Sequence, residues 1–260
     1  MTTNEPIELP PLAGQLAEIW QALAQLAGAA GDLRWTLVGG QMVMLHGLER
    51  STTPDRVSND IDAAVDVRAD PHAVAKLVRV LTTLGFENAG VSPEGHAYRY
   101  RRGKDAHLTI DVVVDQPEED DLIVDVLVSD NLGERANIRT IGHATAFPAP
   151  GVHQALQRTE RVAISIAGAT ALIPRPNLLG AIVAKATACA VDNRDTDRHH
   201  TDLAFLCGLV NDPIEMAAHT TRSDRRRLTR AAEILPEDHP VWSRRADALA
   251  ALEILRTLPS

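Results

Sequence analysis

The sequence predicts an α+β fold, in which a mixed β-sheet lobe with flanking helices precedes a C-terminal helical lobe. Three observations predict it. Short apolar, β-branched runs alternate with helical patterns over the first 148 residues. Beyond that point the apolar residues recur mostly at helical spacing, and the segment 147–151 (FPAPG) separates the two textures. We therefore expect one domain over residues 1–148 and a second, mainly helical domain over residues 149–260.

The individual elements follow from periodicity and from the glycines and prolines between them. Expected helices of the first lobe cover residues 11–30, 41–47 and 71–85, closed by Gly31, Gly47 and Gly85. Expected strands cover residues 34–38, 60–67, 97–102, 107–115 and 121–130. In the second lobe we expect one short helix, a hairpin at residues 161–173, and helices at 177–192, 197–210, 222–235 and 241–258.

The composition is that of a globular protein. Of 260 residues, 45% are hydrophobic and 23% are charged, and no apolar run approaches the roughly 20 residues of a membrane helix. The chain begins without a basic segment or an apolar core, so we expect a cytoplasmic protein without membrane contact. A net charge of −9 argues against a protein that coats nucleic acid nonspecifically. Cys189 and Cys207 lack metal-ligand spacing, and we expect both to be reduced core residues.

Two aspartates open the expected strand at residues 60–67. In a strand, residues i and i+2 point to one face, so Asp60 and Asp62 project together while Ile61 faces the core. Two parallel carboxylates repel each other unless a cation lies between them, and Mg²⁺ is commonly held by carboxylates together with substrate phosphates. The alternative interpretation of this DxD is a helix cap or a solvated turn before an ordinary strand.

The glycine pair after the strand at residues 34–38 favours the metal interpretation. Gly39 and Gly40 allow the backbone to approach a ligand closely, and the following helix presents its N-terminal amides. A plain tight turn is the alternative for the pair considered alone. Taken with the aspartates, the pair predicts a triphosphate held between backbone amides and a metal ion.

A third carboxylate on a neighbouring strand would complete a two-metal site. Asp125 lies among apolar residues of the expected strand 121–130, where an unpartnered charge is costly. Asp111 has the same character in the expected strand 107–115. We favour Asp125 and keep Asp111 as the alternative.

Together these segments resemble a known family. VGGQMVMLHG, NDIDAAVDV, IVDVLVSDNLG and the segment 178–206 are similar to those of the AbiEii-like nucleotidyltransferases, the toxins of type IV toxin–antitoxin systems, which include the MenT enzymes of mycobacteria. This family belongs to the polymerase-β-type nucleotidyltransferase superfamily. The resemblance covers roughly residues 34–210. The interval between Gly40 and Asp60 is longer than the superfamily usually has, so the segment STTPDRVS looks like an insertion.

The resemblance implies a site and a reaction. Gly39 and Gly40 match the turn that grips the nucleotide, and Asp60, Asp62 and Asp125 match the carboxylates that bind Mg²⁺ or Mn²⁺. A lysine and an aspartate on C-terminal helices are also functional in the family and match Lys185 and Asp202. The implied activity is transfer of NMP from an NTP to the 3′ end of a tRNA, opposed by a cognate antitoxin protein. The alternatives are nucleotidylation of a protein or small molecule, or a nucleotide-binding regulatory module without catalysis.

The two helical residues have structural interpretations as well. Lys185 lies in a strongly apolar stretch, where its stem either reaches the surface or brings a point charge to the triphosphate. Asp202 precedes an apolar run and either pairs with Arg194 or Arg198, or steadies Lys185 or the attacking hydroxyl.

Two basic segments are candidate acceptor contacts. Five arginines, Arg222, Arg225, Arg226, Arg227 and Arg230, accompany one aspartate within nine residues. This run is either an RNA backbone track or a solvated helix face. The segment 98–102 (YRYRR) combines aromatic and basic side chains and is the second candidate, able to stack on a base or nucleotide.

Overall fold

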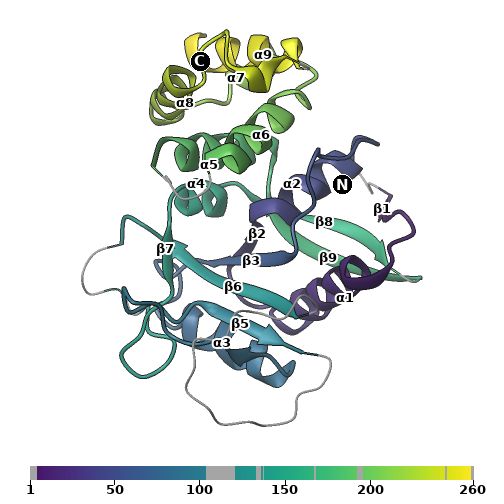
Figure 1. The fold of residues 1–260 in the computed structure, drawn as a ribbon, viewed down its shortest axis with the longest axis vertical. Helices are drawn as coiled ribbons and strands as arrows, with labels where there is room; N and C mark the ends of the chain where they lie inside the picture. Colours follow the sequence, from purple (N-terminus) through teal and green to yellow (C-terminus); the bar gives the residue numbers. More distant parts are fainter. Residues whose placement is uncertain are drawn as a thin grey trace.

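A six-stranded mixed sheet lies at the centre of the N-terminal part of the chain (Figure 1). The computed structural model describes residues 5–103, 121–132, 136, 138–166, 168–191, 196–243 and 245–258. The strands are β2 (Trp35–Val38), β3 (Asp60–Val65), β4 (Glu87–Asn88), β5 (Arg99–Arg102), β6 (Leu122–Ser129) and β7 (Phe147–Ala149). Their order is β2-β3-β6-β5-β4, with β7 paired to β6. β3, β6 and β7 are parallel, whereas β2, β5 and β4 pair antiparallel with their neighbours.

The two faces of this sheet contact different helices, because alternate side chains of a strand point to opposite faces. Ile61, Ala63 and Val65 of β3 are buried in the main core, where α1 (Gly14–Ala29) and α3 (Ala73–Thr83) pack on the sheet. On the other face Ala64 packs in a smaller apolar cluster with residues of α4 (Val152–Gln157) and α5 (Leu178–Val191). Asp60 and Asp62 share that second face with Ala64, as the alternation predicted.

A second, three-stranded sheet lies beside the first. It consists of β1 (Ile7–Glu8), β8 (Thr159–Ile166) and β9 (Ala169–Pro176), and the antiparallel pairing of β8 with β9 confirms the expected hairpin. Although it lies beyond residue 148, the hairpin packs against α1 and β2 of the N-terminal part.

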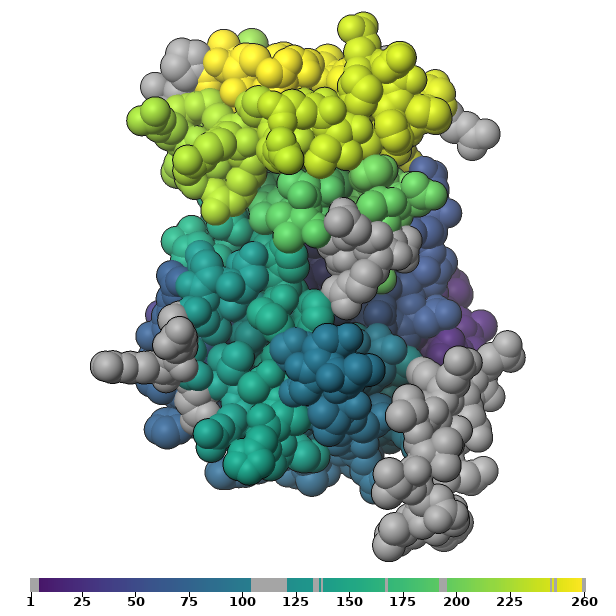
Figure 2. Space-filling model, turned by 60° about the vertical axis from the view of Figure 1, so that its left-hand side comes forward, coloured from purple at the N-terminus to yellow at the C-terminus, as the bar shows by residue number. Residues whose placement is uncertain are grey.

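The remaining helices stack at one end of the molecule, where Figure 2 shows them in green to yellow. They are α5, α6 (Thr196–Cys207), α7 (Pro213–Ala217), α8 (Arg222–Ile234) and α9 (Ala246–Thr257), with a short 3-10 turn at Pro240–Trp242. A capping box between Thr221 and Asp224 fixes the start of α8. Among the described residues, no helix combines the length and the apolar character needed to cross a membrane. The expected α+β class is confirmed.

Three local expectations need correction or fall outside the structure. The helix α2 (Gly39–Leu48) begins at the first glycine of the pair and runs past Gly47. Gly47 therefore does not end the helix, and a Cβ there would lie 2.7 Å from the Thr52 carbonyl oxygen and 2.9 Å from the Phe205 ring. The short strand β7 was not expected in the FPAPG segment. The expected strand 107–115 lies outside the described residues.

Candidate active site

Three carboxylates meet on adjacent strands at one end of the sheet. Asp62 of β3 stands directly beside Asp125 of β6 in the parallel register, and Asp60 precedes Asp62 on the same face. One oxygen from each of the three carboxylates lies within 4.8 Å of the other two. Asp111, the alternative third carboxylate, lies outside the described residues. The structure thus brings Asp60, Asp62 and Asp125 together.

The ionised carboxylates of this cluster repel one another. Burial, together with the neighbouring Asp60 and Asp125, raises the pKa of Asp62 well above its usual value. Burial also raises the pKa of Asp125, although Arg99 opposes that shift. Carboxylate oxygens are hard ligands, and a divalent cation among them would stabilise their ionised forms against mutual repulsion. The cluster therefore fits Mg²⁺ or Mn²⁺.

The glycine pair allows the helix α2 to start against these carboxylates. Gly39 has a φ of 68°, which L side chains rarely adopt, and a Cβ on it would overlap the carboxylate of Asp62. A Cβ on Gly40 would overlap the side chain of Ser58. The N-cap residue of α2 is Val38, which makes no side-chain capping bond, and the first amides of a helix are a common site for an anion.

Lys185 and Asp202 form a buried ion pair between α5 and α6. The Lys185 Nζ donates to Asp202 Oδ2 at 2.7 Å, and the two residues are 6% and 1% exposed. Arg56, from the loop between α2 and β3, donates to both oxygens of Asp202 at 3.0 and 2.8 Å. Burial alone would raise the pKa of Asp202, but Lys185 and Arg56 outweigh it and hold that pKa below its usual value. Lys185 therefore does not reach the outer surface, and Asp202 fixes both cations.

The loop that resembled an insertion supplies part of the site. Ser58 Oγ donates to Asp60 Oδ1 at 2.5 Å, and Gln41 of α2 donates to the Ser58 carbonyl oxygen at 2.6 Å. Arg56 lies in the same loop, and the preceding Asp55 accepts from Arg245 Nη2 at 2.8 Å, just before α9. The loop thus connects the carboxylate cluster to the C-terminal helices.

Arg99 lies at the β5 side of the cluster. Its Nε and Nη2 donate to the two oxygens of Asp125 at 2.9 and 2.8 Å, a bidentate pair across adjacent strands. Sequence reasoning placed Arg99 in a basic patch but did not pair it with Asp125.

Most of these side chains line one cleft of about 280 Å³, although Asp202 itself is not among its lining residues. Its polar part contains the three aspartates with Arg56, Ser58, Arg99, Lys185, Arg198 and His199. Its apolar part contains Val38, Met42, Leu127, Phe147, Ala149, Pro150, Val152, Ala184 and Ala188, with Tyr98 beside them. Sequence reasoning did not identify Arg56, Ser58, Arg198 or His199 as site residues. A nucleotide likewise combines charged phosphates with an apolar planar base.

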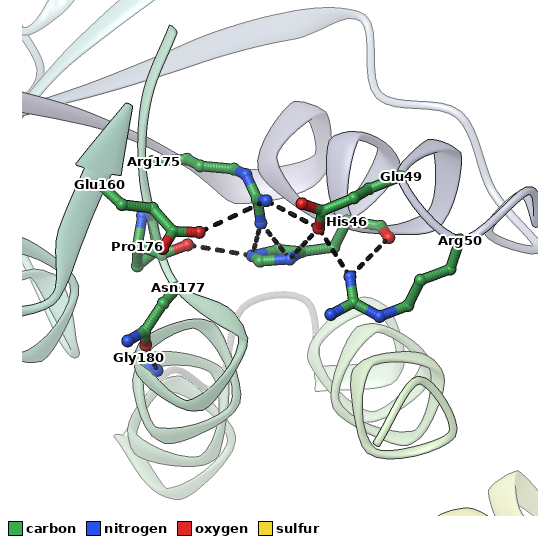
Figure 3. A network of polar contacts seen from close by, with 8 residues as sticks. All are labelled: His46, Glu49, Arg50, Glu160, Arg175, Pro176, Asn177 and Gly180. Atoms are coloured by element: carbon green, nitrogen blue, oxygen red, sulfur yellow. Dashed lines mark hydrogen bonds and ion pairs between the residues drawn. The ribbon is translucent and has the colours of Figure 1, made fainter. Parts of the chain in front are cut away.

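A buried polar network connects α2 to β9 (Figure 3). Arg175 of β9 is 1% exposed, contacts the ring of His46 in α2, and donates to Glu49 Oε2 at 2.7 Å. The ring nitrogen Nε2 of His46 donates to the Pro176 carbonyl oxygen at 3.0 Å. Burial, Arg175 and Arg50 lower the pKa of His46 well below its usual value, which keeps the ring neutral. The network joins α2 to the strand that leads directly into α5.

Comparison with known proteins gives a fold match. No protein-family model and no curated protein sequence matches the chain. Among solved structures, the chain is similar to the crystal structure of an antigenic nucleotidyltransferase-like protein from Paracoccidioides brasiliensis. The TM-score is 0.51 at 16% sequence identity, over 91% of this chain and 93% of that one. The chain therefore has an α+β fold similar to that of this nucleotidyltransferase-like protein.

Proposed function

We propose that the protein is a metal-dependent nucleotidyltransferase that transfers NMP from an NTP to an acceptor hydroxyl. The meeting of Asp60, Asp62 and Asp125 beside the Gly39 turn carries the proposal. A carboxylate cluster without phosphate-binding amides would suit many metal sites, and a glycine turn without carboxylates would suit many loops. The likeness in fold to a protein described as nucleotidyltransferase-like supports the combination.

In this proposal the groups of the cleft bind the metal, bind the phosphates and accept a proton. Asp60, Asp62 and Asp125 would hold Mg²⁺ or Mn²⁺, which supplies Lewis-acid polarisation of the phosphates and neutralises developing charge. The first amides of α2 bind the terminal phosphates, and Lys185 offers a positive charge to the departing pyrophosphate. The acceptor oxygen bonds to the α-phosphorus as the bond from that phosphorus to the pyrophosphate oxygen breaks. Asp125 accepts the proton from the acceptor hydroxyl.

We further propose that the acceptor is a tRNA 3′ end, and that the protein acts as an AbiEii-like toxin with a cognate antitoxin. The resemblance of the sequence segments around Gly39, Asp60, Asp125 and Lys185 supports this assignment. The helix α8 adds support, because Arg222, Arg226 and Arg230 are exposed along it. Modification of the tRNA end would stop translation.

The test is incubation of the purified protein with tRNA and each labelled NTP, with Mg²⁺ or Mn²⁺. Label on tRNA from one NTP is the expected result, and Asp60→Ala/Asp62→Ala abolishes it. Asp238→Ala, which removes an exposed carboxylate that does not line the cleft, serves as the matched control. Label on protein or a small molecule would replace the tRNA assignment, and nucleotide-induced thermal stabilisation without any transfer would refute the enzymatic proposal.

A further inference from the structure

We propose that Tyr98 and Phe147 form a stacking platform for the terminal base of a nucleic-acid acceptor, with Arg99 at its edge. This inference rests on the proposed function, because it assigns the acceptor side of the same cleft. It adds two residues that contribute to binding the acceptor.

The first step is the order of residues across the sheet. Val38, Asp62, Asp125 and Arg99 occupy one continuous row, since each is paired in register with the next across β2, β3, β6 and β5. Neighbouring strands are about 4.8 Å apart, so the ends of this row are separated by roughly 14 Å. The Gly39 turn follows Val38 at one end, and Arg99 lies at the other.

The second step is the geometry of phosphoryl and nucleotidyl transfer. The attacking and leaving oxygens lie roughly in line through the phosphorus. If the terminal phosphates bind at the Gly39 turn, the leaving pyrophosphate departs toward β2. The acceptor oxygen must then approach from the opposite side, which is the side of Asp125 and Arg99.

The third step is what the structure presents on that side. Tyr98 and Phe147 both line the cleft and are only partly buried, with ring centroids 5.2 Å apart. The Arg99 guanidinium carbon lies 5.7 Å from the centre of the Tyr98 ring. The ring of His96 packs on that of Phe147 in a T-shaped arrangement, with the two ring centroids 5.5 Å apart. Tyr100, two residues further along, is buried in the core instead.

The combination favours a nucleic-acid end over an aliphatic or peptide acceptor. The chain has only two tyrosines and three phenylalanines, and one of each lies at this position. Aromatic rings beside an arginine bind unstacked bases of a single strand, with little dependence on base identity.

The experiment measures acceptor binding without metal or turnover. A short single-stranded RNA with a terminal 2-aminopurine reports stacking through fluorescence quenching. Tyr98→Leu and Phe147→Leu are expected to weaken its binding by about 5- to 150-fold each, the range measured for loss of one base–aromatic stack. Tyr98→Phe retains the ring and restores binding relative to Tyr98→Leu. Ile214→Ala, at an exposed apolar residue of α7 that does not line the cleft, is the matched control.

Steady-state kinetics supply the second readout. Tyr98→Leu is expected to raise KM for the acceptor while KM for the NTP and the affinity for Mn²⁺ stay unchanged. A rise in KM for the NTP alone, or unquenched RNA with the wild-type protein, would overturn the platform. Quenching that depends on Tyr98 in a protein that transfers no nucleotide would uphold the platform and refute the proposed function.

Discussion

Replacing Gly39 with alanine tests how the helix start and the carboxylates depend on each other. Gly39 has a φ of 68°, and the added methyl group would overlap the Asp62 carboxylate. The backbone and the carboxylate therefore cannot both keep their positions. We expect Gly39→Ala to lose stability and metal affinity together.

The magnitude has two parts. Left-handed backbone geometry costs an alanine about 1–2 kcal/mol, which lowers the melting temperature of a chain of this size by about 2–8 °C. The overlap with Asp62 adds to that loss. Because Gly39 shapes a metal ligand without being one, we expect Mn²⁺ affinity to fall by about 10- to 100-fold.

Gly142→Ala is the matched control. Gly142 also has a positive φ, of 55°, but an added Cβ there would meet no atom within 4 Å. It should show the backbone cost alone and bind Mn²⁺ as the wild type does. Melting temperatures and calorimetric Mn²⁺ titrations of the three proteins separate the two parts. If Gly39→Ala bound Mn²⁺ normally and melted with Gly142→Ala, the claimed contact between the turn and Asp62 would be wrong.

Three further predictions follow from the ionisable residues. Asp62→Asn should raise the free energy of unfolding of the metal-free protein near pH 7, because burial and neighbouring carboxylates oppose the charge of Asp62. It should also weaken Mn²⁺ binding, because a carboxylate ligand is lost. Calorimetry with and without Mn²⁺ tests both effects, and a metal-free variant less stable than the wild type would contradict the first. Asp202→Asn should lower the free energy of unfolding by about 3–5 kcal/mol, since Lys185 and Arg56 lose their shared carboxylate. Urea denaturation measures this, and a loss below about 1 kcal/mol, the value of a surface ion pair, would show that the pair is not buried as described. The pKa of His46 is lowered in the folded protein, so its contribution to stability is fully present above about pH 6.5. Below that pH the free energy of unfolding falls by up to about 1.4 kcal/mol per pH unit, because the unfolded histidine takes up a proton that the buried ring does not. His46→Gln should remove that part of the pH dependence in denaturation curves, and an unchanged pH dependence would count against a neutral buried ring.

The carboxylate cluster could be predicted because its positions are written in local patterns. Alternation along β3 places Asp60 and Asp62 on one face, whatever the rest of the fold does. Asp125 stood out because a charge among apolar strand residues requires a partner. In the structure β3 pairs with β6, and the register of this pair places Asp62 beside Asp125.

The loop residues could not be predicted from such patterns. Arg56 and Ser58 lie in a polar segment without periodicity, and the contact of Arg56 with Asp202 spans 146 residues. No local signal reports a partner at that distance along the chain. The start of α2 was misjudged for a different reason. Glycine usually interrupts helices, but at Gly39 it permits both the positive φ and the close approach to Asp62.

The loop before β3 also constrains how this chain can change. Its consecutive residues Asp55 and Arg56 are hydrogen-bonded to Arg245 ahead of α9 and to Asp202 in α6, while Ser58 donates to Asp60 of the carboxylate cluster. Substitutions in the interior of the C-terminal helices would therefore displace this loop and change the geometry of the carboxylate cluster. Sequence changes in the C-terminal helices are therefore constrained by the geometry that the cleft requires.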